Sequence, residues 1–293
     1  MGEVTPARTA RGILLMMLAM GLMASMDASA KLLVEDYPIP QILLVRFLVF
    51  LVFALALARR RGFRVTLRSR KPVLQIVRTL VMLVEIWVFV WAFSLLPLAN
   101  VHAIAAVSPL MAMALAVPLL GERVGWHRWT AVAAGLVGVL IIVRPGIAQT
   151  DWAMAIPVLA AFLWALLQIL IRKAGLSDPI ETTGLWTATI AVLVMALVAP
   201  FVWIAPDARA WGLLLLTGLL GTMGHMTLFK ALELAPASAV QPFSYMMMVW
   251  AALLGFLVFG AFPDAWTILG ALVIVASGLY AFARERRRPA SAL

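Results

Sequence analysis

The residues of this sequence that could do chemistry are ionisable side chains set inside long apolar stretches. Asp27, Lys31, Arg46, Arg78 and Glu85 all lie in such stretches. A charge at the centre of a membrane helix costs about 2.5–3.5 kcal/mol on insertion scales, so these side chains are expected to face protein or a watery cavity. Asp27 and Lys31 are four residues apart, on one helix face, where they can pair. We predict that Asp27, Lys31, Arg46 and Arg78 act as an ion cluster or gate, with internal bracing of helices as the alternative.

Glu85 is expected near the middle of its helix. At the helical rise of about 1.5 Å per residue, it lies about 18 Å from the inner end of the stretch 73–95. A lone buried carboxylate favours its protonated form, because desolvation penalises the charged one. Glu85 is therefore either a proton-coupling site or a neutral, hydrogen-bonded core residue.

Several polar and aromatic residues lie at similar depths in three other apolar stretches. Small-ligand sites combine aromatic walls with a few polar groups. The pattern predicts a substrate cavity, and ordinary helix packing is the alternative. Together with Glu85, the candidate cavity residues are Trp164, Gln168, His225, Gln241, Ser244, Tyr245 and Trp250.

Enzyme motifs are absent from the sequence. It contains no H-E-x-x-H, G-x-S-x-G or Walker sequence, and its three histidines are widely spaced. It has no cysteine, which excludes disulfides and thiolate metal sites. We expect no catalytic residue, no metal and no cofactor, and treat an integral-membrane enzyme as the unlikely alternative.

The elements that must position these residues are membrane helices. Of 293 residues, 65% are hydrophobic and 12% charged, whereas soluble domains have about a quarter of their residues charged. A crossing needs about 20 apolar residues. The sequence predicts an all-α integral membrane protein with ten transmembrane helices, near 13–35, 39–57, 73–95, 98–120, 129–145, 152–172, 182–204, 210–230, 236–259 and 265–283. In the alternative interpretation, Arg8 and Arg11, the first span and Ala28-Ser29-Ala30 form a cleaved secretory signal.

The net charge of +10 is distributed asymmetrically along these spans. With a cytoplasmic amino terminus, eighteen of the 23 basic residues fall on the inner side. This positive-inside pattern predicts that both termini are cytoplasmic, and the location is expected to be the bacterial inner membrane. The charge therefore requires no nucleic-acid partner; the expected partners are the lipid bilayer and a small-molecule substrate.

Five spans lie on each side of the polar segment 146–151, so the second half must insert in the opposite orientation. Setting Pro97 on Pro236 gives a gapless offset of 139 that also pairs Gly121 with Gly260. We predict two inverted five-helix repeats, 1–146 and 147–293, the layout of secondary transporters whose substrate site lies near the midplane.

Prolines lie within or at the mouths of the fourth and ninth predicted helices. Proline removes a backbone donor and kinks a helix. Such kinks are candidate hinges of a rocking motion, although proline is also common in membrane helices. The candidate hinges are Pro97, Pro109, Pro118, Pro236 and Pro242.

Four stretches carry a resemblance to a known family. They are Leu95–Leu110, Leu120–Gly125, Gly135–Gly146 and Phe229–Pro242. The chain resembles the drug/metabolite transporter superfamily, in its EamA-type ten-helix branch, and looks most like aromatic amino-acid exporters of the YddG type. In the resembled family, the fifth and tenth helices pack on one another within a chain, which makes a monomer the expectation and a homodimer the alternative.

The resemblance implies a secondary, alternating-access carrier, and export of aromatic or broadly neutral amino acids is the expected function. Uptake of riboflavin or S-adenosylmethionine, or drug efflux, is the alternative. The small four-helix relatives carry a proton-coupling glutamate in their first helix. Here Met23 and Ala165 occupy the matching positions, so that site is not transferred.

Overall fold

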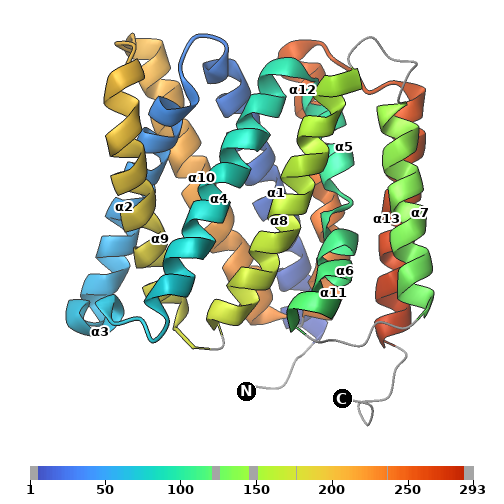
Figure 1. Cartoon of the computed structure of the whole chain (residues 1–293), viewed down its shortest axis with the longest axis horizontal. Helices are drawn as coiled ribbons and strands as arrows, with labels where there is room; N and C mark the ends of the chain where they lie inside the picture. Colours follow the sequence, from blue (N-terminus) through green and yellow to red (C-terminus); the bar gives the residue numbers. More distant parts are fainter. Residues whose placement is uncertain (1–5, 121–125, 145–150, 176, 236, 287–293) are drawn as a thin grey trace.

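The structure, a computed structural model, describes residues 6–120, 126–144, 151–175, 177–235 and 237–286. Within these ranges every regular element is helical. The elements are α1 (Pro6–Val34), α2 (Ile39–Arg61), α3 (Phe63–Leu67), α4 (Pro72–Leu95), α5 (Leu98–Ala105), α6 (Ser108–Leu120), α7 (Trp126–Val143), α8 (Asp151–Gly175), α9 (Ile180–Val198), the 3-10 helix η1 (Ala199–Val202), α10 (Ala208–Leu234), α11 (Ala237–Val240), the 3-10 helix η2 (Gln241–Tyr245), α12 (Met246–Phe259) and α13 (Ala265–Arg286). The long helices stand side by side as a bundle (Figure 1).

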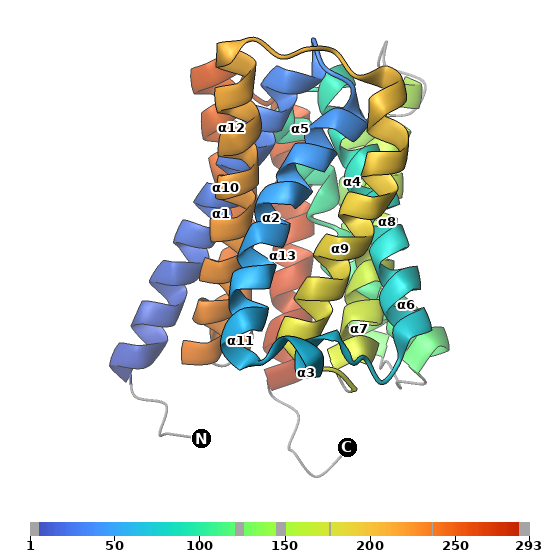
Figure 2. The same cartoon turned by 90° about the vertical axis from the view of Figure 1, so that its left-hand side faces the viewer.

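Nine segments of the described chain are long and apolar enough to cross a membrane, so the protein is a multi-pass membrane protein. They match nine of the ten predicted spans. The remaining prediction, 129–145, falls on α7, whose apolar part, Trp129–Val143, is shorter. The described chain starts and ends at the same end of the bundle, where α3 also lies (Figures 1 and 2). This end is called the inner end below.

Two predicted helices are interrupted rather than continuous. The span 98–120 divides into α5 and α6, with the break at Ala106 and Val107. The span 236–259 divides into α11, η2 and α12, and the 3-10 segment ends at Tyr245. Pro109 and Pro242 lie beside these breaks, and proline cannot donate the backbone hydrogen bond that a continuous helix requires. Ala106 and Tyr245 are related by the 139-residue offset seen in the sequence.

The fates of the other candidate hinges differ. Pro97 precedes α5 as its N-cap residue, and Pro118 lies inside α6. Pro236 lies outside the described residues. Pro157, inside α8, is a further helix-interior proline that the hinge prediction omitted.

Glycines allow α10 to approach its neighbours closely, as the spacing of Gly218, Gly221 and Gly224 predicts. A Cβ added at Gly224 would lie 2.8 Å from Cγ of Met23, and one added at Gly221 would lie 2.7 Å from the sulfur of Met26. Both methionines belong to α1. The strip therefore serves helix packing, and it fixes α10 against the helix that carries Asp27.

Candidate functional site

Asp27 of α1 and His102 of α5 meet in the interior of the bundle. Asp27 Oδ2 lies 3.3 Å from His102 Nε2, and the two residues are only 6% and 5% exposed. The rings of Phe89 and Phe93 lie against the imidazole, with centroids 5.4 and 5.8 Å away. α5 is a short segment of a broken helix, and five of the seven other residues of α5 are buried with His102.

Three further ionisable groups gather around this pair. Arg46 of α2 interacts electrostatically with both Asp27 and Glu85. Glu85 of α4 is 5% exposed. His225 of α10 donates from Nδ1 to the carbonyl oxygen of Gly221 at 2.7 Å, since a carbonyl can only accept. A Cβ on Gly221 would also lie 3.5 Å from Nε of Arg46, which places that guanidinium beside α10.

We call Asp27, Arg46, Glu85, His102 and His225 the buried centre. Five different helices supply its members, and none is adjacent to another in sequence. It combines two carboxylates, one guanidinium and two imidazoles in an apolar surrounding. Such a set can hold a charged ligand group or exchange protons, because its net charge depends on the protons it carries.

Lys31 takes other partners than the predicted Asp27. Its ammonium donates to the carbonyl oxygen of Leu96 at 3.0 Å and to that of Phe93, at the end of α4. The ring of Phe259 lies 5.4 Å away. A cation is favourable at a helix C-terminus, where carbonyls lack partners within the helix. Lys31 thus joins α1 to α4 at the outer end of the bundle.

Arg78 lies apart from the buried centre, although the sequence grouped it with Asp27, Lys31 and Arg46. Its guanidinium donates to Gln75 Oε1 at 3.1 Å, to the carbonyl of Thr183 at 3.2 Å and to the hydroxyl of Thr187. These contacts join α4 to α9 towards the inner end. Arg78 is 3% exposed.

Asp178, in the turn between α8 and α9, collects hydrogen bonds from the linker that leads into α4. Its carboxylate accepts from Ser69 Oγ at 2.5 Å, the Arg70 backbone N–H at 2.8 Å and Gln75 Nε2 at 2.9 Å. Burial alone would raise the pKa of Asp178, but these hydrogen bonds hold the pKa below its usual value. The sequence analysis did not identify Asp178. The only sequence signal that could have indicated a structural role was its position in a polar Ser-Asp-Pro segment between two apolar stretches.

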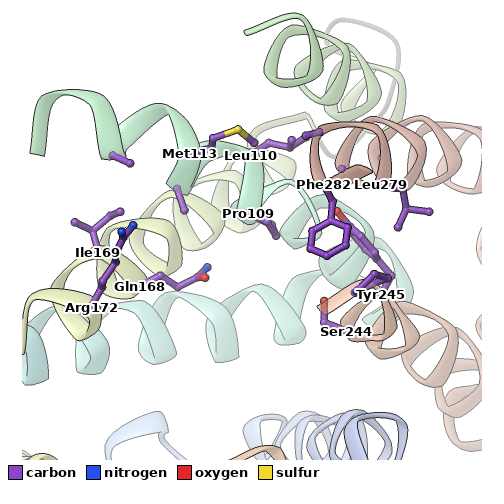
Figure 3. A pocket seen from close by; sticks show the side chains of 15 residues that line it. Pro109, Leu110, Met113, Gln168, Ile169, Arg172, Ser244, Tyr245, Leu279 and Phe282 are labelled. Carbon is purple, nitrogen blue, oxygen red and sulfur yellow. The ribbon is translucent and has the colours of Figure 1, made fainter. Parts of the chain in front are cut away.

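A cavity of about 310 Å³ opens between α6, α8, η2 and α13. Three of the predicted cavity residues, Gln168, Ser244 and Tyr245, line it together. Arg172 and Phe282 stand at the same cavity, and Figure 3 shows these side chains converging from α8, η2 and α13. Aromatic walls with a few polar groups suit a small organic ligand.

The remaining cavity candidates do not line this space. Glu85 and His225 belong to the buried centre, and Trp164 is a half-buried residue of α8. The indole N–H of Trp250 donates to the carbonyl of Met17 at 3.2 Å, so this side chain ties α12 to α1. The side chain of Gln241 lies outside the described part of the structure.

A helical bundle that crosses the membrane many times, encloses charged groups and contains a ligand-sized cavity has the architecture of a membrane transporter. The chain belongs to the EamA-like transporter family, whose model matches residues 10–144 and 151–282. The prediction of the EamA-type family is thereby confirmed. A solved crystal structure with 20% sequence identity shares the fold, with a TM-score of 0.62 over 96% of this chain and 98% of that one.

Curated relatives have several substrates. An S-adenosylmethionine uptake transporter of Rickettsia bellii is 28% identical over 76% of each chain. A riboflavin transporter of Rhizobium johnstonii is 31% identical over 81% of this chain and 78% of its own. A pseudopaline exporter of Pseudomonas aeruginosa is 26% identical over 90% and 93%. None of these three relatives is named as an aromatic amino-acid exporter, the function expected from the sequence. Two of them are named for S-adenosylmethionine and riboflavin, which were the alternative substrates.

Proposed function

We propose that this transporter carries a small metabolite that bears both a positive and a negative group, with S-adenosylmethionine the first to test. The observation that supports this most strongly is the mixed charge of the buried centre. Arg46 is suited to a substrate carboxylate, and Asp27 and Glu85 are suited to an ammonium or sulfonium group. Burying either kind of charge without a partner is costly, so a mixed site favours a substrate with both.

Export of aromatic or neutral amino acids is the narrower form of the same proposal. Amino acids and S-adenosylmethionine share the α-amino-acid group, which the buried centre would recognise. The aromatic residues Tyr245 and Phe282 at the cavity suit the ring of an aromatic amino acid or the adenine of S-adenosylmethionine. The relatives support both directions of transport, since one is named as an uptake transporter and another as an exporter.

Riboflavin is the second candidate, because a riboflavin transporter is 31% identical over most of both chains. Its flavin ring carries no formal charge. A riboflavin carrier would therefore use the aromatic cavity, and the buried centre would brace the helices.

We also propose that residues 1–146 and 147–293 form inverted repeats of five crossings, with α7 as the fifth. The equivalent breaks at Ala106 and Tyr245 support this, as does the common end at which the described chain begins and ends. The basic linker before α4 supports a cytoplasmic inner end and therefore cytoplasmic termini in the bacterial inner membrane. Packing of α7 on α13 within the chain supports a monomer.

Proteoliposomes with purified protein test the proposal. Counterflow of labelled S-adenosylmethionine, phenylalanine, leucine and riboflavin is compared with that in empty vesicles. We expect flux of at least one amino-acid-bearing compound and its loss in Arg46→Gln, with Arg209→Gln, an exposed arginine near the outer end, as the control. Riboflavin flux alone, unchanged in Arg46→Gln, would replace the first candidate by the second.

A further inference from the structure

We propose that the corner formed by the α2–α4 linker and the first turns of α4 binds an anionic phospholipid of the adjacent leaflet. We call this region the basic corner and define it by Arg68, Arg70, Lys71, Val73 and Val77. None of its residues lines the 310 Å³ cavity or belongs to the buried centre.

The first observation is uncompensated positive charge. Residues 59–71 hold seven basic residues and no acidic one. Arg68, Arg70 and Lys71 are exposed, and their side chains make no hydrogen bond or ion pair with any described residue. The linker is held to Asp178 by the Ser69 hydroxyl and the Arg70 backbone N–H, not by these three cationic side chains. These cations are therefore available to an anionic group, and several Lys/Arg residues beside a membrane helix favour anionic headgroups.

The second observation is a shallow, open apolar groove on the first turns of α4, which begins at the same place. A surface cavity of about 410 Å³ is lined by Lys71, Pro72, Val73, Leu74 and Val77. Val73 is 71% exposed and Val77 44% exposed. Apart from Lys71, which stands at the start of α4, every lining side chain is apolar. A ligand that fits both parts has an anionic head and a hydrocarbon tail.

The short helix α3 strengthens the choice of a lipid. Phe63 and Leu67, four residues apart, are 47% and 45% exposed. Apolar side chains flanked by arginines at the end of a membrane helix are typical of a segment in the headgroup region. Figures 1 and 2 place α3 at the inner end, beside the start of α4. A soluble phosphate would use the cations but neither the groove nor this apolar face.

The basic corner is physically joined to the helices of the second half. Arg70 and Ser69 bind Asp178 in the α8–α9 turn, and the Trp186 indole of α9 donates to the carbonyl of Leu67 at 3.1 Å. A lipid that immobilises the linker therefore also steadies α9. Lipid binding is expected to raise the thermal stability of the whole bundle.

The test uses the full-length protein, delipidated in detergent. The protein is titrated with phosphatidylglycerol or with phosphatidylcholine of equal chain length, and native mass spectrometry counts the bound lipid molecules. We expect phosphatidylglycerol to bind more tightly and to raise the melting temperature. The triple variant Arg68→Gln/Arg70→Gln/Lys71→Gln should bind it at least about tenfold more weakly, since three cations that attract the anionic headgroup are lost.

The matched control, Arg11→Gln/Arg284→Gln/Arg286→Gln, removes three basic residues at the same end but away from the groove. It should keep wild-type affinity. A second variant, Val73→Gln/Val77→Gln, should weaken binding of the lipid, and glycerol phosphate at matched ionic strength should neither bind nor compete. Equal losses in the two triple variants, or displacement by glycerol phosphate, would overturn the proposal in favour of diffuse electrostatics or a soluble anion.

Discussion

Gly138 of α7 and Gly270 of α13 face each other where the backbones of these two helices approach closely. A Cβ on Gly138 would lie 2.8 Å from the carbonyl oxygen of Gly270, and a Cβ on Gly270 would lie 2.5 Å from that of Gly138. Real Cβ atoms do not approach backbone oxygen so closely. The small residues of α7 are therefore used within the chain, as the family resemblance implied.

Gly270→Ala is expected to destabilise the protein. The added methyl forces α7 and α13 apart, and overpacking of this kind costs about 1–3 kcal/mol. Thermal unfolding in detergent measures the effect. Gly212→Ala is the control, because a Cβ at Gly212 meets nothing within 4 Å. A melting temperature for Gly270→Ala equal to that of the control would show that the two helices do not pack this closely.

Asp178→Asn should loosen the inner end and change its response to acid. The folded-state pKa of Asp178 lies below its usual value, so its stabilisation is present above the unfolded pKa of about 3.9 and is lost as pH falls through the folded pKa. The variant should be about 1–2 kcal/mol less stable at pH 7. Its stability should also fall less than that of the wild type between pH 5 and 3. Asp36→Asn, at an exposed position, is the control, and parallel pH profiles for wild type and Asp178→Asn would contradict the assignment.

Glu85→Gln tests proton coupling at the buried centre. When both carboxylates are ionised they exceed the single guanidinium by one negative charge, which a proton or a cationic substrate group can neutralise. We expect flux in proteoliposomes to lose its response to an imposed pH gradient in the variant, while counterflow without a gradient persists. Glu35→Gln, at an exposed position outside the membrane span, is the control. An identical gradient response in wild type and Glu85→Gln removes Glu85 from the proton role.

Gln168→Leu tests the cavity beside Tyr245. Losing a polar contact that is equal in the ground and transition states raises KM without changing kcat. We expect about a tenfold higher KM for substrate added at the inner side, from the loss of about 1.4 kcal/mol of binding. Phe162→Leu, at an exposed position on the same helix, should leave KM unchanged. An unchanged KM in Gln168→Leu would exclude this cavity from the substrate path.

Hydropathy and charge were sufficient to place the membrane helices, because a run of about 20 apolar residues has few other stable outcomes. Depth along a helix also identified Asp27, Arg46, Glu85 and His225 as interior residues. The contact partners of these side chains were harder to predict. Lys31 donates to carbonyls of α4, and His102 contacts Asp27. These contacts depend on the rotation of each helix about its axis and on the break after α5, and the spacing of residues along one helix does not reveal either property.

The contact between α10 and α1 sets glycine on one surface against methionine on the other. Met23 and Met26 are unbranched thioethers that change rotamer at low cost, and Gly221 and Gly224 present no side chain to obstruct them. This close contact therefore also sets the depth of two members of the buried centre, because His225 directly follows Gly224 in α10 and Asp27 directly follows Met26 in α1.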